Sequence, residues 1–222
     1  MSNLISLQLK PETYHSFQAI YHKLNEGHAV SQAKDLGENL ADITCEIINQ
    51  VFGQISKIST SQDQESDKVI QQLLQNTRKY MPWSVSFFDN ERLTPMVNYV
   101  QEMTYEKEGH YFIFYSVNKT LIADLLGHVA QIKLGKSEYV APALKLFTQV
   151  VDQGVNSLIR EPKKMLKFNL MVDKTLNGII HLTTQLGYKR FDKLATSYDT
   201  QTIGQFFDHF LVFLDNQTKN DS

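Results

Sequence analysis

A few histidines that lie at helical spacing from carboxylates are the strongest candidates for chemistry in this sequence of 222 residues. Glu12 and His15 are three positions apart, which places a carboxylate and an imidazole one helical turn apart. Carboxylate sites for two metal ions in helix bundles take such a Glu-x-x-His pair from each of two helices. This chain carries a single copy. We therefore expect no metal centre, and His15 remains a candidate for ligand binding.

Two further histidines lie beside polar residues on predicted helices. Asp124 and His128 are four positions apart, so both fall on one flank of a helix, at the margin of its apolar face. His181 follows Asp173 by eight positions, which forms a polar stripe on an apolar helix. Such a stripe either lines a cavity or faces solvent. The candidate ligand-binding residues are thus His15, Asp124, His128 and His181, and simple exposure to solvent is the competing interpretation.

No motif of a common enzyme class occurs in the chain. The sequence lacks a phosphate-binding loop, a dinucleotide fingerprint, a Gly-x-Ser-x-Gly turn and a His-Glu-x-x-His zinc motif. Its single cysteine, Cys45, excludes a disulfide within the chain and zinc sites built from several cysteines. No catalytic residue is assigned, and we expect neither a metal nor another cofactor.

An aromatic segment, residues 83–88, is the best candidate for a contact surface. It follows a proline and places Trp83, Phe87 and Phe88 within six positions. Aromatic side chains are enriched at the centres of protein interfaces. The competing interpretation is that these rings close one end of the hydrophobic core.

Composition indicates an ordinary globular protein. Hydrophobic residues make up 42% of the chain and charged residues 21%, and the net charge is −2. No apolar run approaches the roughly 18 residues that cross a bilayer, and no secretory signal is visible, so we expect a cytoplasmic protein without membrane insertion. Two small basic clusters are too weak to predict nucleic-acid binding: Arg160, Lys163, Lys164 and Lys167, and then Lys189, Arg190 and Lys193.

The elements that must position these residues are mostly amphipathic helices with start and stop signals. We predict an all-α fold, a single domain over residues 1–222 with about seven or eight helices. Residues 57–66 are predicted as a surface loop and 216–222 as a frayed tail. The predicted helices cover 11–27, 35–56, 67–82, 94–103, 118–135, 143–160, 163–186 and 200–214. The alternative is an α+β fold in which 4–9, 84–88 and 111–117 form a small sheet.

The most apolar of these segments, residues 163–186, is predicted to form a central helix that Gly187 ends. Its apolar residues cover a wide arc, which is typical of a helix packed on several sides. The missing motifs and the aromatic patch around Trp83 and Phe87 favour a non-catalytic helical protein that acts through contacts with a protein partner or with a second copy of itself, as a homodimer. The alternative is a helical enzyme or carrier that binds an apolar ligand or cofactor between its central helices.

Overall fold

Helices account for most of residues 3–58 and 64–215, which are the residues that the computed structural model describes. The fold is helical with a small antiparallel sheet, as the sequence predicts. The α-helices of the described chain are α1 Pro11–Asn25, α2 Ala33–Ile58, α3 Gln64–Val85, α4 Asn90–Glu102, α5 Lys119–Lys133, α6 Val140–Val155, α7 Glu161–Met165, α8 Leu170–Ser197 and α9 Thr200–Leu211. A 3-10 turn, Ser137–Tyr139, precedes α6, and a π-helical turn, Asn156–Arg160, joins α6 to α7.

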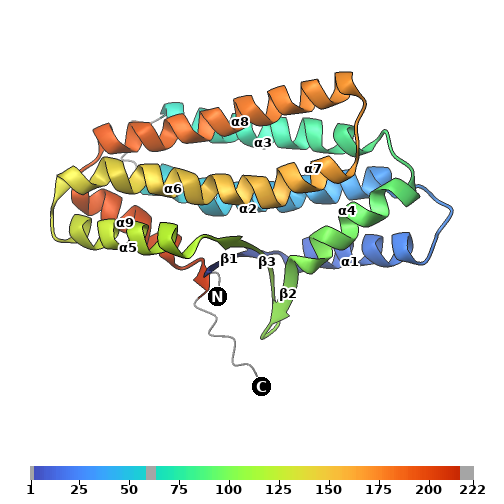
Figure 1. The fold of residues 1–222 in the computed structure, drawn as a ribbon, viewed down its shortest axis with the longest axis horizontal. Helices are drawn as coiled ribbons and strands as arrows, with labels where there is room; N and C mark the ends of the chain where they lie inside the picture. Colours follow the sequence, from blue (N-terminus) through green and yellow to red (C-terminus); the bar gives the residue numbers. More distant parts are fainter. Residues whose placement is uncertain (1–2, 59–63, 216–222) are drawn as a thin grey trace.

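The helices lie in layers (Figure 1). Helices α3 and α8 contact each other along one side of the molecule, and they pack on α2 and α6 respectively. On the other side of α2 and α6 lie α5, α9 and the sheet, with α1 and α4 at one end. Helices α2 and α6 are therefore covered on both sides.

The sheet has the strand order β2-β3-β1-β4 and antiparallel pairing throughout. Its strands are β1 Asn3–Leu9, β2 Thr104–Lys107, β3 His110–Val117 and β4 Leu214–Asp215. The pairing of β1 with β3 runs from Asn3↔Val117 to Leu9↔Tyr111. This confirms the strands predicted at 4–9 and 111–117. The strand predicted at 84–88 is wrong, because α3 continues to Val85 and a turn follows it.

Local capping signals locate several helix ends correctly. The side chain of Asn118 accepts a hydrogen bond from the Leu121 amide at 3.2 Å, so Asn118 begins α5 as predicted. Gly27 and Gly135 follow α1 and α5 with φ values of 72° and 82°, the left-handed conformation in which glycine commonly ends a helix. At α4, by contrast, Asp89 rather than Thr94 is the N-cap, so that helix begins earlier than predicted.

The prediction of a buried central helix at 163–186 is wrong: both of its ends differ from those in the structure, and its first half is exposed. Residues 163–165 end α7, and Asn169 caps the start of α8, which continues through Gly187 to Ser197. Gly187 does not stop the helix, because it lies against the Phe52 ring, where an added Cβ would come within 3.1 Å. Leu170, Met171 and Leu182 are more than 60% exposed, so the first half of α8 is a surface helix.

The predicted loop 57–66 is helical at both ends, since α2 reaches Ile58 and α3 begins at Gln64. Residues 59–63 lie outside the described residues, as does the predicted tail 216–222.

A cluster of aromatic rings lies in the core between α6, α8 and α9. Phe147 is fully buried, and its ring centroid lies 4.4–5.9 Å from those of Phe191, Phe206, Phe207 and Phe210. The inner face of β1 contributes Ile5, Leu7 and Leu9, each at most 1% exposed. This cluster anchors the C-terminal half of α8.

Candidate functional site

The structure does not bring the four polar candidates from the sequence together. His15 lies on α1, Asp124 and His128 on α5, and His181 on α8, at separate places in the fold (Figure 1). His15, Asp124 and His181 are exposed, and His128 is half-buried. The four residues therefore form no common site.

Each of the α1 and α5 histidines has local partners. The His128 ring nitrogen Nδ1 lies 2.8 Å from the backbone oxygen of Asp124, so the interaction does not involve the Asp124 carboxylate. The edge of the same ring packs on Tyr139. His15 packs on Tyr111, with ring centroids 4.8 Å apart. These contacts account for both side chains as packing residues of the surface.

The aromatic segment divides between surface and core. Phe87 is 51% exposed and lies against the half-buried Trp83, with the ring centroids 5.1 Å apart. Phe88 is only 7% exposed and packs on Phe168, and Arg92 lies over its face. Only Trp83 and Phe87 thus present a surface.

An apolar cavity of about 220 Å³, partly open to solvent, lies between the α3–α8 layer and the α2–α6 layer. We call it the central cavity. Strand β3 and helix α4 add to its lining, and so does the π-helical turn. Its walls are formed mainly by Leu, Ile, Val, Met and Phe side chains, among them Leu40, Ile43, Ile47, Val51, Leu73, Met81, Val100, Val155, Leu158, Leu176 and Ile180.

The lining of the central cavity is elongated. It covers three turns of each of three helices: Leu40 to Phe52 on α2, Leu73 to Val85 on α3 and Leu176 to Tyr188 on α8. Twelve positions at 1.5 Å per residue correspond to roughly 18 Å of helix axis. The lining therefore forms a slot that runs along the helices.

The wall formed by α3 and α8 is partly open to solvent. Tyr80 and Met81 of α3 and Ile179, Ile180 and Thr183 of α8 all line the cavity and are only half-buried. On α2, Ile43 and Val51 are at most 9% exposed, whereas Leu40, Thr44, Ile47 and Ile48 are half-buried as well. The cavity is therefore nearest to solvent at these half-buried lining residues.

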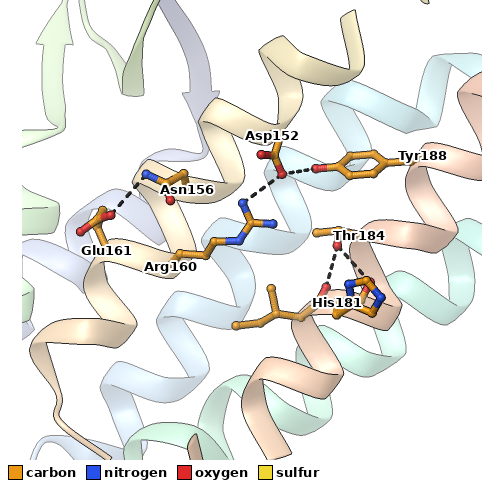
Figure 2. A network of polar contacts seen from close by, with 8 residues as sticks. Asp152, Asn156, Arg160, Glu161, His181, Thr184 and Tyr188 are labelled. Carbon is orange, nitrogen blue, oxygen red and sulfur yellow. Dashed lines mark hydrogen bonds and ion pairs between the residues drawn. The ribbon is translucent and has the colours of Figure 1, made fainter. Parts of the chain in front are cut away.

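A polar network flanks the cavity where α6 faces α8. Figure 2 shows the Asp152 carboxylate accepting hydrogen bonds from the Arg160 guanidinium at 2.9 Å and from the Tyr188 hydroxyl at 2.6 Å. Burial, and then the hydrogen bond to Asp152, raise the pKa of Tyr188, so its hydroxyl remains a neutral donor. The Asp152–Arg160 pair is partly exposed, and we assign it little stabilising effect.

The π-helical turn Asn156–Arg160 places residues on both sides of this wall. Leu158 and Ile159 line the cavity, whereas Arg160 turns to Asp152. The Tyr99 hydroxyl donates to the Ser157 backbone oxygen at 3.1 Å, inside the turn. Single π-helical turns within α-helices are frequent at functional sites. The turn is therefore a second feature that favours a functional role for this wall of the cavity.

Lys163 is the one charged side chain among the described residues that line the cavity. Its side chain is 12% exposed, and its ammonium pairs with the Asp173 carboxylate on the first turn of α8. Asp173 also accepts from the Asn177 amide at 2.9 Å. The positive charge is thus balanced by the protein itself.

Strand β3 brings Tyr115 to the cavity wall. Tyr115 is 5% exposed, and its ring lies against Gly154 of α6, where an added Cβ would come within 2.8 Å of the ring. Sequence reasoning did not single out Tyr115, Lys163 or Tyr188 as site residues. The one available signal was the apolar run 111–117, in which a strand places Ile113 and Tyr115 on the same face.

Comparisons with known proteins give no lead: no family model matches the chain, and no significant similarity is found to curated proteins or to solved structures. Within residues 3–58 and 64–215, no three His, Cys, Asp or Glu side chains gather as a metal site would require. Over the same residues, no helix combines the length and the apolar character that crossing a membrane requires. Among the described residues, the central cavity is the feature that best indicates a function.

Proposed function

We propose that the protein binds a chain-like apolar molecule in the central cavity, as a carrier or storage protein for that molecule. The observation that carries this proposal is the cavity itself. At about 220 Å³ it exceeds a cavity of roughly 150 Å³ that accommodates benzene in a well-studied protein core. Its slot shape suits an aliphatic chain better than a broad ring system.

The energetics favour an occupied cavity. Its walls are mostly apolar, and covering apolar surface stabilises by roughly 25 cal/mol per Å². A bound chain covers these walls and buries its own apolar surface.

Contacts through Trp83 and Phe87, the function favoured by the sequence, remain a prediction. Phe87 is exposed, but Phe88 belongs to the core, so the surface is smaller than the segment suggested. Ligand binding in the central cavity has more structural support than contacts through Trp83 and Phe87.

Filling the cavity tests the proposal. Ile180→Trp places an indole into the slot from α8, and we expect it to weaken binding of the uncharged fluorescent probe N-phenyl-1-naphthylamine at least tenfold. Because the indole occupies empty space, the melting temperature should hold or rise, whereas overpacking a filled core costs about 1–3 kcal/mol. Fluorescence titration and thermal melts measure both effects.

Leu182→Trp is the matched control, because Leu182 lies two positions away on α8 and is 65% exposed. We expect it to bind the probe as the wild type does. Equal probe affinity of the two variants, or no binding by the wild type, would contradict the proposal.

A further inference from the structure

Tyr115, at 5% exposure, is the least exposed of the polar side chains that line the central cavity. Its hydroxyl makes no hydrogen bond to any residue within 3–58 or 64–215, although the side chain is 5% exposed and lines the cavity. Hydroxyl groups inside proteins usually have a hydrogen-bond partner. A missing partner in a cavity wall indicates that a bound molecule supplies it.

Asn76, Tyr80 and Thr183 also line the cavity without a side-chain hydrogen bond to the described residues, but they are only half-buried. Most of the other polar side chains of the lining are satisfied within the protein. The Tyr188 hydroxyl donates to Asp152, and Lys163 pairs with Asp173. The hydroxyls of Thr44, Ser84 and Thr184 donate to backbone oxygens of their own helices. Thr77 also lies inside a helix, where its hydroxyl can rotate to the carbonyl four residues earlier. A tyrosine hydroxyl cannot do this, since it sits at the end of a rigid ring.

We propose that Tyr115 donates a hydrogen bond to an oxygen atom of an uncharged chain-like ligand, such as a long-chain ketone, ester, ether or alcohol. This inference rests on the proposed function and specifies its ligand class. Burial raises the pKa of Tyr115, so its hydroxyl stays protonated and able to donate. A charged head group does not fit, because Asp173 already balances Lys163 and an unpaired charge in an apolar cavity is strongly disfavoured.

The position of Tyr115 in the cavity also predicts where along the ligand the acceptor oxygen lies. The Tyr115 ring contacts Gly154, which is two positions from Asp152, the partner of Tyr188. Lys163 is nine positions further along the same run of helix, or roughly 13 Å away at 1.5 Å per residue. The hydrogen bond therefore forms nearer the Tyr188 end of the slot than the Lys163 end. A chain that fills the slot must carry its oxygen closer to one end than to its middle.

The test compares n-undecane, 2-undecanone, 6-undecanone and undecanoate as competitors of N-phenyl-1-naphthylamine, in the wild type and in Tyr115→Phe. The substitution keeps the ring and removes the hydroxyl. We expect the affinity for 2-undecanone to fall about three- to tenfold, the loss of one neutral hydrogen bond. The affinity for n-undecane should stay within about twofold, because the alkane makes no hydrogen bond.

Two other outcomes would overturn the inference. In one, Tyr115→Phe leaves the ratio of ketone to alkane affinity unchanged. In the other, the wild type binds undecanoate more tightly than 2-undecanone. A wild type that binds neither the probe nor any competitor refutes the proposed function instead, so the two failures are distinguishable.

The ketone isomers keep the test decisive if Tyr115→Phe does not fold, as judged by circular dichroism. The two isomers have the same composition, so an apolar cavity without a hydrogen-bond donor at a fixed position binds them with similar affinity. A fixed donor near one end favours 2-undecanone over 6-undecanone by about threefold or more. Equal affinities of the wild type for the two isomers would contradict the proposed hydrogen bond from Tyr115.

Discussion

Phe147→Ala should lower the free energy of unfolding by about 3–5 kcal/mol, the usual cost of deleting a buried phenylalanine. Phe147 is fully buried, and its ring touches four other aromatic rings from α8 and α9. Removing it leaves a void that these rigid neighbours cannot close, because each is itself held by the others. Urea denaturation, followed by circular dichroism at 222 nm, measures the loss.

Phe87→Ala is the control for this prediction. It removes the same side chain at a position that is 51% exposed, where Trp83 packs against the ring. Substitutions at exposed positions usually change stability by less than about 0.5 kcal/mol, and the contact with Trp83 raises that figure only slightly. A loss below about 1 kcal/mol for Phe147→Ala would show that the aromatic cluster lies outside the cooperative core.

Helix ends were predictable where one residue decides them locally. Asn118 caps α5 through its own side chain, and Gly27 and Gly135 follow their helices in a conformation that other residues rarely adopt. Pro82 and Gly187 misled the prediction because packing outweighs their local cost. Both lie inside helices at close contacts, Pro82 against Gly37 and Gly187 against Phe52.

The central cavity was only half predictable. The apolar face of α2, with Leu40, Ile43, Ile47 and Val51, is evident from helical spacing and does face the interior. Whether the helices opposite fill the space depends on the separation between layers, and no local pattern reports that distance. The sequence therefore indicates which residues face inward but does not reveal the void between them.

The candidate site residues show a related limit. Carboxylates and histidines three or four positions apart occur on any exposed helix flank, so the spacing of Asp124 and His128 did not by itself indicate a site. No local pattern in the sequence marked Tyr115 as a site residue. It lies in an apolar run that is compatible with a buried strand or a buried helix, and Gly154, which its ring contacts, lies on a helix 39 positions later. Only the fold brings the two together.

Gly37→Ala should destabilise the protein by about 2 kcal/mol, although alanine is the better helix former. Gly37 lies where α2 meets α3, and an added Cβ would come within 2.6 Å of the Pro82 Cα and 2.8 Å of a Val85 methyl group. The backbone of α3 must move away to admit it, which costs about 3 kcal/mol as overpacking. The gain in helix propensity offsets only about 1 kcal/mol of this.

Gly53→Ala, on the same helix, isolates the propensity term. The nearest contact of an added Cβ there is Asn49 Cβ at 4.0 Å, an ordinary van der Waals distance. We expect this variant to gain up to about 1 kcal/mol. The two substitutions are chemically identical, so opposite signs in urea denaturation would isolate the close packing of α2 on α3 as the cause. A gain in stability for Gly37→Ala would mean that α2 and α3 lie further apart than the structure places them, and that the central cavity beside them is wider.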